Sequence, residues 1–162
     1  MICMVQANIG LSQEQRTGVA KILNTILADE TALYQKTRNF HWNVRGPRFN
    51  DLHEFFEEHY TEIESIIDDV AERARSLGEF ATGTLKELAD LTRLTERPGK
   101  YPPAEDMLGQ LLVDHETIIR HLREDIKQVG EEYEDVGTED FLTGLMMTHE
   151  KKAWMIRSLL DE

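Results

Sequence analysis

Residues 39–78 read NFHWNVRGPRFNDLHEFFEEHYTEIESIIDDVAERARSLG, and this stretch decides both the fold and the candidate chemistry of the chain. It holds three of the six histidines, a Gly-Pro pair and a long acidic segment. Apolar residues recur through it at helical spacing, at Leu52, Phe56, Ile63, Ile67, Val70 and Ala74. This period predicts a helix over about 48–77, which Gly46-Pro47 starts and Gly78 ends.

The same periodicity predicts a long helix before this stretch and two after it. A capping-box pattern at Ser12 begins the first, over about 12–43. Pro102-Pro103 opens the third, which continues to about Val129, and Thr138 is expected to cap the fourth.

Two segments join these helices. Residues 78–101 form a long linker, in which TLKELADL predicts a short helix, and Gly130 to Gly137 form an acidic loop. A linker of this length can travel along a bundle and give the up-down-down-up order. The sequence therefore predicts an all-α, ferritin-like four-helix bundle with one long crossover.

Composition bounds the class of protein. The chain has 162 residues, 40% hydrophobic and 30% charged, which is typical of one globular domain over 1–162 with a short tail over 1–11. We find no apolar run near the ~20 residues of a membrane span and no basic region typical of a signal peptide. Cys3 is the single cysteine, so no internal disulfide forms. These features favour a reducing cytoplasm.

Charge restricts the partners. The net charge is −13, from 18 basic and 31 acidic residues. Such a surface attracts cations and repels phosphate backbones.

The histidines do not fit an ordinary di-iron centre inside one bundle. Such centres use Glu-x-x-His, because positions i and i+3 point both side chains inward from one helix. The residues three before the six histidines are Arg, Asn, Phe, Leu, Ile and Met. The absence of this motif disfavours a di-iron centre inside one bundle. It therefore also disfavours the two protein classes considered with such a centre, the maxi-ferritins and the haem-bearing bacterioferritins.

A metal site shared by two chains fits the spacing better. His41 and His53 straddle the Gly-Pro turn and can converge, whereas Asp68 and Glu72 lie one turn apart on the same helix as His53. Fifteen residues separate His53 from Asp68, which is roughly 22 Å of helix. Two chains packed antiparallel about a two-fold axis would bring each histidine pair onto the other chain's carboxylates. Two imidazoles with carboxylates suit Fe(II), and zinc equally.

The other candidates have ordinary explanations. We assign His59, His115, His121 and His149 to core-edge or solvated positions. Glu54 and Glu58 would by default face solvent on their helix, and the acidic loop would be solvated.

Three segments carry a family resemblance: NFHWNVRGPRF, then LHEFFEEHY with DDVAERARSLG, and finally FLTGLMMTHEKKAWMIRSLL. They resemble the signatures of the Dps mini-ferritins, the DNA-binding proteins from starved cells. The resemblance covers nearly the whole chain. It implies a bundle that assembles into a hollow shell of twelve, with ferroxidase centres at two-fold interfaces.

The resemblance also implies residue roles. His41 and His53 match the histidine ligands, and Asp68 and Glu72 match the carboxylate ligands from the partner chain. Other residues match positions around these ligands in the family. Glu57 matches an acidic residue behind the ligands, and Trp42 matches a tryptophan thought to absorb oxidising equivalents. Glu54 and Glu58 match acidic positions on the inner wall, where mineral nucleates.

The implied activity is oxidation of Fe(II), preferably by hydrogen peroxide rather than O2, with storage of Fe(III) mineral and protection against oxidative stress. Fe(II) would enter through acidic pores, for which the acidic segment from Glu131 to Asp140 is the candidate. The alternative is a nucleoid-compacting DNA-binding protein with a secondary iron role. DNA-binding members use a lysine-rich tail, but residues 1–15 contain no Lys or Arg. The sequence therefore predicts weak or no direct DNA binding.

Overall fold

The computed structural model describes residues 6–161, which form five α-helices and no strand. Their bounds are α1 Gln13–Asn43, α2 Phe49–Ser76, α3 Leu85–Leu91, α4 Ala104–Glu131 and α5 Val136–Leu160. The all-α prediction is confirmed. Cys3 and the first part of the predicted tail lie outside the described residues.

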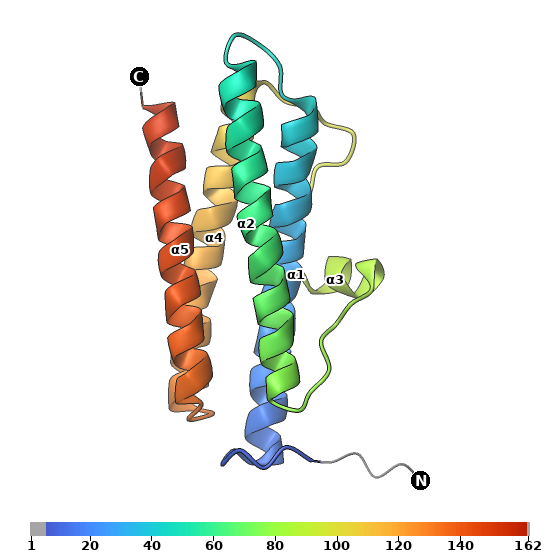
Figure 1. The fold of residues 1–162 in the computed structure, drawn as a ribbon, viewed down its shortest axis with the longest axis vertical. Helices are drawn as coiled ribbons and strands as arrows, with labels where there is room; N and C mark the ends of the chain where they lie inside the picture. Colours follow the sequence, from blue (N-terminus) through green and yellow to red (C-terminus); the bar gives the residue numbers. More distant parts are fainter. Residues whose placement is uncertain (1–5, 162) are drawn as a thin grey trace.

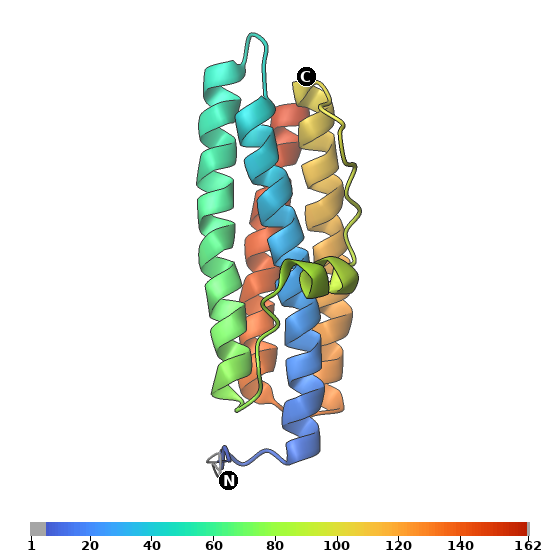
Figure 2. The same cartoon turned by 90° about the vertical axis from the view of Figure 1, so that its right-hand side faces the viewer.

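The four long helices stand side by side as a bundle, with α1 packed on α2 and α4 packed on α5 (Figure 1). The linker leaves α2 at one end of the bundle, carries α3 across the outside of α1, and reaches α4 at the opposite end (Figure 2). The predicted up-down-down-up order, with one crossover containing a short helix, is therefore confirmed. In residues 6–161 no helix combines the length and apolar character that a membrane crossing requires.

The core lies on the apolar stripes that the sequence shows. Leu23, Phe56, Leu111, Leu142 and Ile156 are fully buried, and together they represent all four long helices. Burying an apolar side chain of this size stabilises the folded state by roughly 1.5–3 kcal/mol. The bundle is therefore held mainly by its interior rather than by its surface ion pairs.

The start of α1 and the turn before α2 follow from local chemistry. The Ser12 hydroxyl accepts a hydrogen bond from the backbone N–H of Gln15, and the Gln15 side chain accepts one from the Ser12 N–H, which is the predicted capping box. Gly46 adopts φ +118°, a conformation that disfavours any side chain with a Cβ. Pro47 lies in the turn itself, two residues before α2 begins.

The predicted loop between the last two helices is wrong in its bounds. Helix α4 continues through Gly130 to Glu131, and α5 begins at Val136 rather than after Thr138. The cap is Asp135, whose carboxylate accepts from the Thr138 N–H at 3.1 Å. Gly130 does not end a helix: a Cβ there would lie 2.7 Å from the Glu139 carboxyl carbon on α5. The glycine permits the two helices to approach.

A buried ion pair fastens the linker to the bundle. Asp29 on α1 is fully buried and accepts hydrogen bonds from the Arg93 N–H at 2.6 Å and the Arg93 Nε at 2.7 Å. The same guanidinium reaches Asp125 on α4 at 3.1 Å. Arg93 thus joins linker, α1 and α4 at one point.

Candidate metal centre

The two predicted histidine ligands meet where α1 ends and α2 begins. The rings of His41 and His53 are stacked, with centroids 3.8 Å apart and planes 15° from parallel. The tight turn at Gly46 folds α2 back along α1, which brings two residues twelve positions apart into contact. The convergence expected from the sequence is observed within one chain.

Reciprocal hydrogen bonds fix both rings. His41 Nδ1 lies 2.7 Å from the carbonyl oxygen of His53, and His53 Nδ1 lies 2.8 Å from that of His41. A carbonyl can only accept, so each Nδ1 carries the proton and donates. Nε2 is therefore the nitrogen of each ring that remains for a metal ion. This is how metal-binding histidines are usually held, with the second nitrogen tied to a backbone carbonyl or carboxylate.

Aromatic side chains frame the pair. Phe49 stacks on His53 at 5.0 Å, and Tyr60 meets the His41 ring edge-on at 5.2 Å. Partial burial raises the pKa of Tyr60, and the neighbouring Glu57 carboxylate raises it further. The phenol therefore stays neutral beside the imidazoles.

The other predicted site residues are exposed, and the two predicted carboxylate ligands lie apart from the histidine pair. Asp68 and Glu72 stand on α2, several turns beyond His53, and Glu57 is exposed between them and the pair. Trp42 is 56% exposed, with the Arg38 guanidinium 5.0 Å from its ring. No three His, Cys, Asp or Glu side chains in residues 6–161 converge as a metal site. Within one chain the histidine pair and the two carboxylates therefore lie apart.

Three further histidines lie in the interior of the bundle, whereas the sequence placed them at the edge of the core or in solvent. His59, His115 and His149 are at most 1% exposed, so their assignment to core-edge or solvated positions is wrong. Glu30, also fully buried, joins them. His121 is half-buried, as a core-edge residue should be.

Hydrogen bonds link most of this group. His149 Nε2 lies 2.7 Å from a Glu30 carboxylate oxygen, and His149 Nδ1 lies 2.9 Å from His115 Nδ1. His59 Nδ1 donates to the Phe55 carbonyl at 3.0 Å. Burial, reinforced by Lys152, lowers the pKa of His59 to about 4. Burial, together with His149, holds the pKa of His115 well below its ordinary value.

Sequence reasoning missed this group because its members come from four different helices, so no spacing within one helix reveals it. A signal did exist. Each residue occupies a core position of its helix: His59 follows Phe56 and precedes Ile63, and His115 lies between Leu111 and Ile118. A polar residue at such a position is expected to be buried with a partner.

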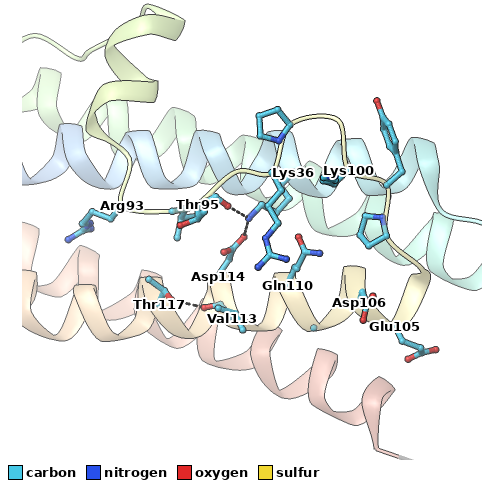
Figure 3. A pocket seen from close by; sticks show the side chains of 16 residues that line it. Lys36, Arg93, Thr95, Lys100, Glu105, Asp106, Gln110, Val113, Asp114 and Thr117 are labelled. Carbon is cyan, nitrogen blue, oxygen red and sulfur yellow. Dashed lines mark hydrogen bonds and ion pairs between the residues drawn. The ribbon is translucent and has the colours of Figure 1, made fainter.

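A large hollow lies away from all of these residues. It measures about 1140 Å³ and lies between the linker and α4. Figure 3 shows Lys36 pointing across it, where its ammonium donates to Asp114 at 2.5 Å and to the Thr95 carbonyl at 2.8 Å. Burial raises the pKa of Asp114, although Lys36 opposes the rise. These contacts fasten the linker, and we assign the hollow no chemistry.

Comparison with known proteins gives a consistent picture. The family model described as a ferritin-like domain matches residues 20–162. The chain is 46% identical to an uncharacterized low temperature-induced protein of Nostoc, over 98% of this chain and 88% of that protein. It is 36% identical to DNA protection during starvation protein 2 of Bacillus anthracis, over 89% of this chain and 97% of that protein.

Solved structures agree with the sequence relatives. DpsC from Streptomyces coelicolor superposes with a TM-score of 0.93 at 31% identity, covering 98% of this chain and 92% of that chain. The similarity therefore extends over nearly the whole bundle, including the crossover.

Proposed function

The chain belongs to the Dps family of ferritin-like proteins, and on this premise we propose that it oxidises Fe(II) at sites shared by two chains. The Fe(III) product would be stored as mineral inside a dodecameric shell. Iron is therefore substrate and cargo, and the activity is that of a ferroxidase.

The observation that carries this proposal is the state of the histidine pair. His41 and His53 are oriented by each other's backbone, and their rings are stacked with centroids 3.8 Å apart, which leaves the Nε2 nitrogen of each ring for a metal ion. Within residues 6–161 no third ligand joins them, while Asp68 and Glu72 stand exposed elsewhere on α2. A two-fold axis that places these carboxylates on the partner's histidines completes two sites at once.

The proposed reaction follows from this ligand set. An acidic surface concentrates Fe(II), and His41 and His53 bind it together with Asp68 and Glu72 of the second chain. Hydrogen peroxide takes one electron from each of two Fe(II) ions and, with two protons, leaves as two waters. Glu57 would orient the site from behind, and Trp42 would donate an electron when iron cannot.

The Fe(III) product carries more charge than Fe(II) and binds hard oxygen ligands more tightly. Glu54 and Glu58 would nucleate mineral on the inner wall. Removing Fe(II) and peroxide together protects the cell against oxidative stress. Zinc suits the same ligands and would compete with Fe(II) for them.

A mixing experiment tests whether the site is shared. We expect His41→Ala/His53→Ala shells and Asp68→Asn/Glu72→Gln shells each to lose peroxide-driven Fe(II) oxidation. When the two variants are co-assembled at random, half of the dimers are mixed, and each mixed dimer holds one intact site of two. The mixed shells should regain about a quarter of the wild-type rate, measured by stopped-flow absorbance of Fe(III).

The matched control combines the histidine variant with a chain that carries all four substitutions, so that no intact site can form. That mixture should stay inactive. A site built within one chain predicts no regain in either mixture, and that result would exclude the shared site.

A further inference from the structure

Glu30, His59, His115 and His149 form an interior histidine cluster, with one residue on each of the four long helices. Each lies near the middle of its helix. Ferritin-like di-iron proteins place their metal ligands on inward-facing positions of the same four helices. The cluster therefore occupies a metal-bearing level of the fold with a different set of side chains.

When each ring carries one proton, the hydrogen bonds assign the nitrogen that holds it. The Glu30 carboxylate accepts, so His149 Nε2 donates to it. With one proton on each ring, His149 Nδ1 then accepts from His115 Nδ1. His115 Nε2 is left as a lone pair. His59 reaches the same state because its Nδ1 donates to the Phe55 carbonyl.

Three atoms of the cluster have no hydrogen-bond partner although they are buried. They are Glu30 Oε2, His59 Nε2 and His115 Nε2. Leaving a buried polar atom unpaired costs about 1–3 kcal/mol, and more for a charged group. Two of these atoms, His59 Nε2 and His115 Nε2, belong to rings that lie edge to face across α2 and α4, and an electron-pair acceptor between them would satisfy both.

We propose that each bundle binds one imidazole-preferring divalent cation of the zinc class between His59 and His115. Both rings are held by a backbone carbonyl or by a histidine–carboxylate relay, as metal ligands usually are. Their centroids lie 6.1 Å apart. Two imidazoles on one tetrahedral zinc ion, with Zn–N bonds of roughly 2.0–2.1 Å, place their centroids roughly 5 Å apart, so the two rings must approach by about 1 Å to share the ion.

The third ligand is Glu62, one turn beyond His59 on α2. In this structure Glu62 is paired with Lys152, whose side chain is 11% exposed. Because no three ligands converge in residues 6–161, Glu62 must leave Lys152 to complete the site. Lys152 therefore opposes binding in two ways, since it repels the cation and holds the carboxylate.

An acidic hollow gives access to Glu62. It measures about 450 Å³ and lies on α2, lined by Glu54, Glu57, Glu58, Thr61 and Glu62. Four carboxylates on one wall concentrate cations at the outer end of the route. A cation that exchanges from this wall onto Glu62 is then one helical turn from His59.

The test uses the His41→Ala/His53→Ala protein, so that its outcome is independent of the shared site. Co²⁺ is used as the probe because it binds to zinc sites and has a visible absorption spectrum. This absorption is strong only when the ion has few ligands in a near-tetrahedral arrangement. We expect one such Co²⁺ per chain, displaced by Zn²⁺. Adding His115→Gln should weaken Co²⁺ binding at least tenfold, whereas His121→Gln, on the same helix outside the cluster, should not change it.

Two measurements keep the proposal falsifiable if the His115 variant does not fold. Anomalous diffraction at the zinc edge from zinc-soaked His41→Ala/His53→Ala crystals should place a peak between His59 and His115, and a water there without anomalous signal would overturn the proposal. Lys152→Gln should tighten Co²⁺ binding several-fold. Unchanged or weaker binding would contradict the role given to Glu62.

Discussion

At the scale of single residues, the buried neutral histidines couple stability to pH. The pKa of His59 is about 4, below its ordinary value near 6.5, so the unfolded chain binds a proton that the folded chain does not. Its contribution to stability is complete above pH 6.5 and is lost as pH falls toward 4. His115 adds to the loss in the same direction.

We therefore expect the metal-free protein to lose at least about 2 kcal/mol of unfolding free energy between pH 7 and pH 5 through these residues. Urea unfolding at a series of pH values measures this loss. His59→Gln should flatten the pH dependence even though it lowers stability at pH 7. An unchanged slope in that variant, with His121→Gln as the matched control, would show that His59 is not the titrating group.

At the scale of helices, two glycines show how close the packing is. A Cβ on Gly18 of α1 would lie 2.2 Å from the Tyr133 ring, and the Tyr133 carbonyl accepts from Gln15 at 2.9 Å. A Cβ on Gly130 would instead meet the end of the flexible Glu139 side chain at 2.7 Å. A ring held in place must shift as a body, whereas a carboxylate can rotate away.

The two substitutions should therefore differ. Gly18→Ala is expected to lower the unfolding free energy by about 1–3 kcal/mol through overpacking. Gly130→Ala should be near neutral, because alanine favours the helix by up to ~1 kcal/mol and offsets the displaced carboxylate. Thermal unfolding of the pair measures the difference. Equal effects would mean that Tyr133 moves as freely as Glu139.

The helices could be predicted from the sequence wherever apolar period and caps agree. The capping pattern at Ser12 predicted the start of α1, and the length of the linker between α2 and α4 predicted the crossover. The start of α5 could not be predicted, because Gly130 and Gly137 look like helix breakers. In the structure both glycines lie within helices, where they leave room for a neighbouring side chain. Gly130 leaves room for the Glu139 carboxylate, and the Arg73 guanidinium lies 3.0 Å from the position that a Cβ on Gly137 would take.

The candidate site divides in the same way. His41 and His53 could be predicted because one tight turn relates them. The interior histidine cluster of Glu30, His59, His115 and His149 could not, because its members are brought together by packing between helices that are distant in sequence. Whether Asp68 and Glu72 complete the site remains a prediction that depends on a second chain.

At the scale of the whole molecule, charge governs which polymers can approach. Each chain carries −13, and a dodecamer would carry twelve times that, about −156 before iron is loaded. Nucleic-acid binding depends on clustered positive charge that releases counterions from the phosphates.

We therefore expect no retardation of linear DNA in a gel-shift assay at physiological salt and neutral pH. Grafting a lysine-rich segment onto the N-terminus should create salt-sensitive retardation in otherwise identical shells, which serves as the positive control. A complex of the unmodified protein that survives physiological salt would favour a DNA-compacting role over iron storage as the primary function.

The turn at Gly46 has a consequence for synthesis on the ribosome. His41 and His53 are twelve residues apart on a hairpin that is complete once α2 has emerged, and short loops close quickly. The buried cluster needs His149, which emerges only with the last helix. The nascent chain can therefore form the His41–His53 pair long before the interior histidine cluster assembles, so the pair would be in place before a second chain could supply its carboxylates.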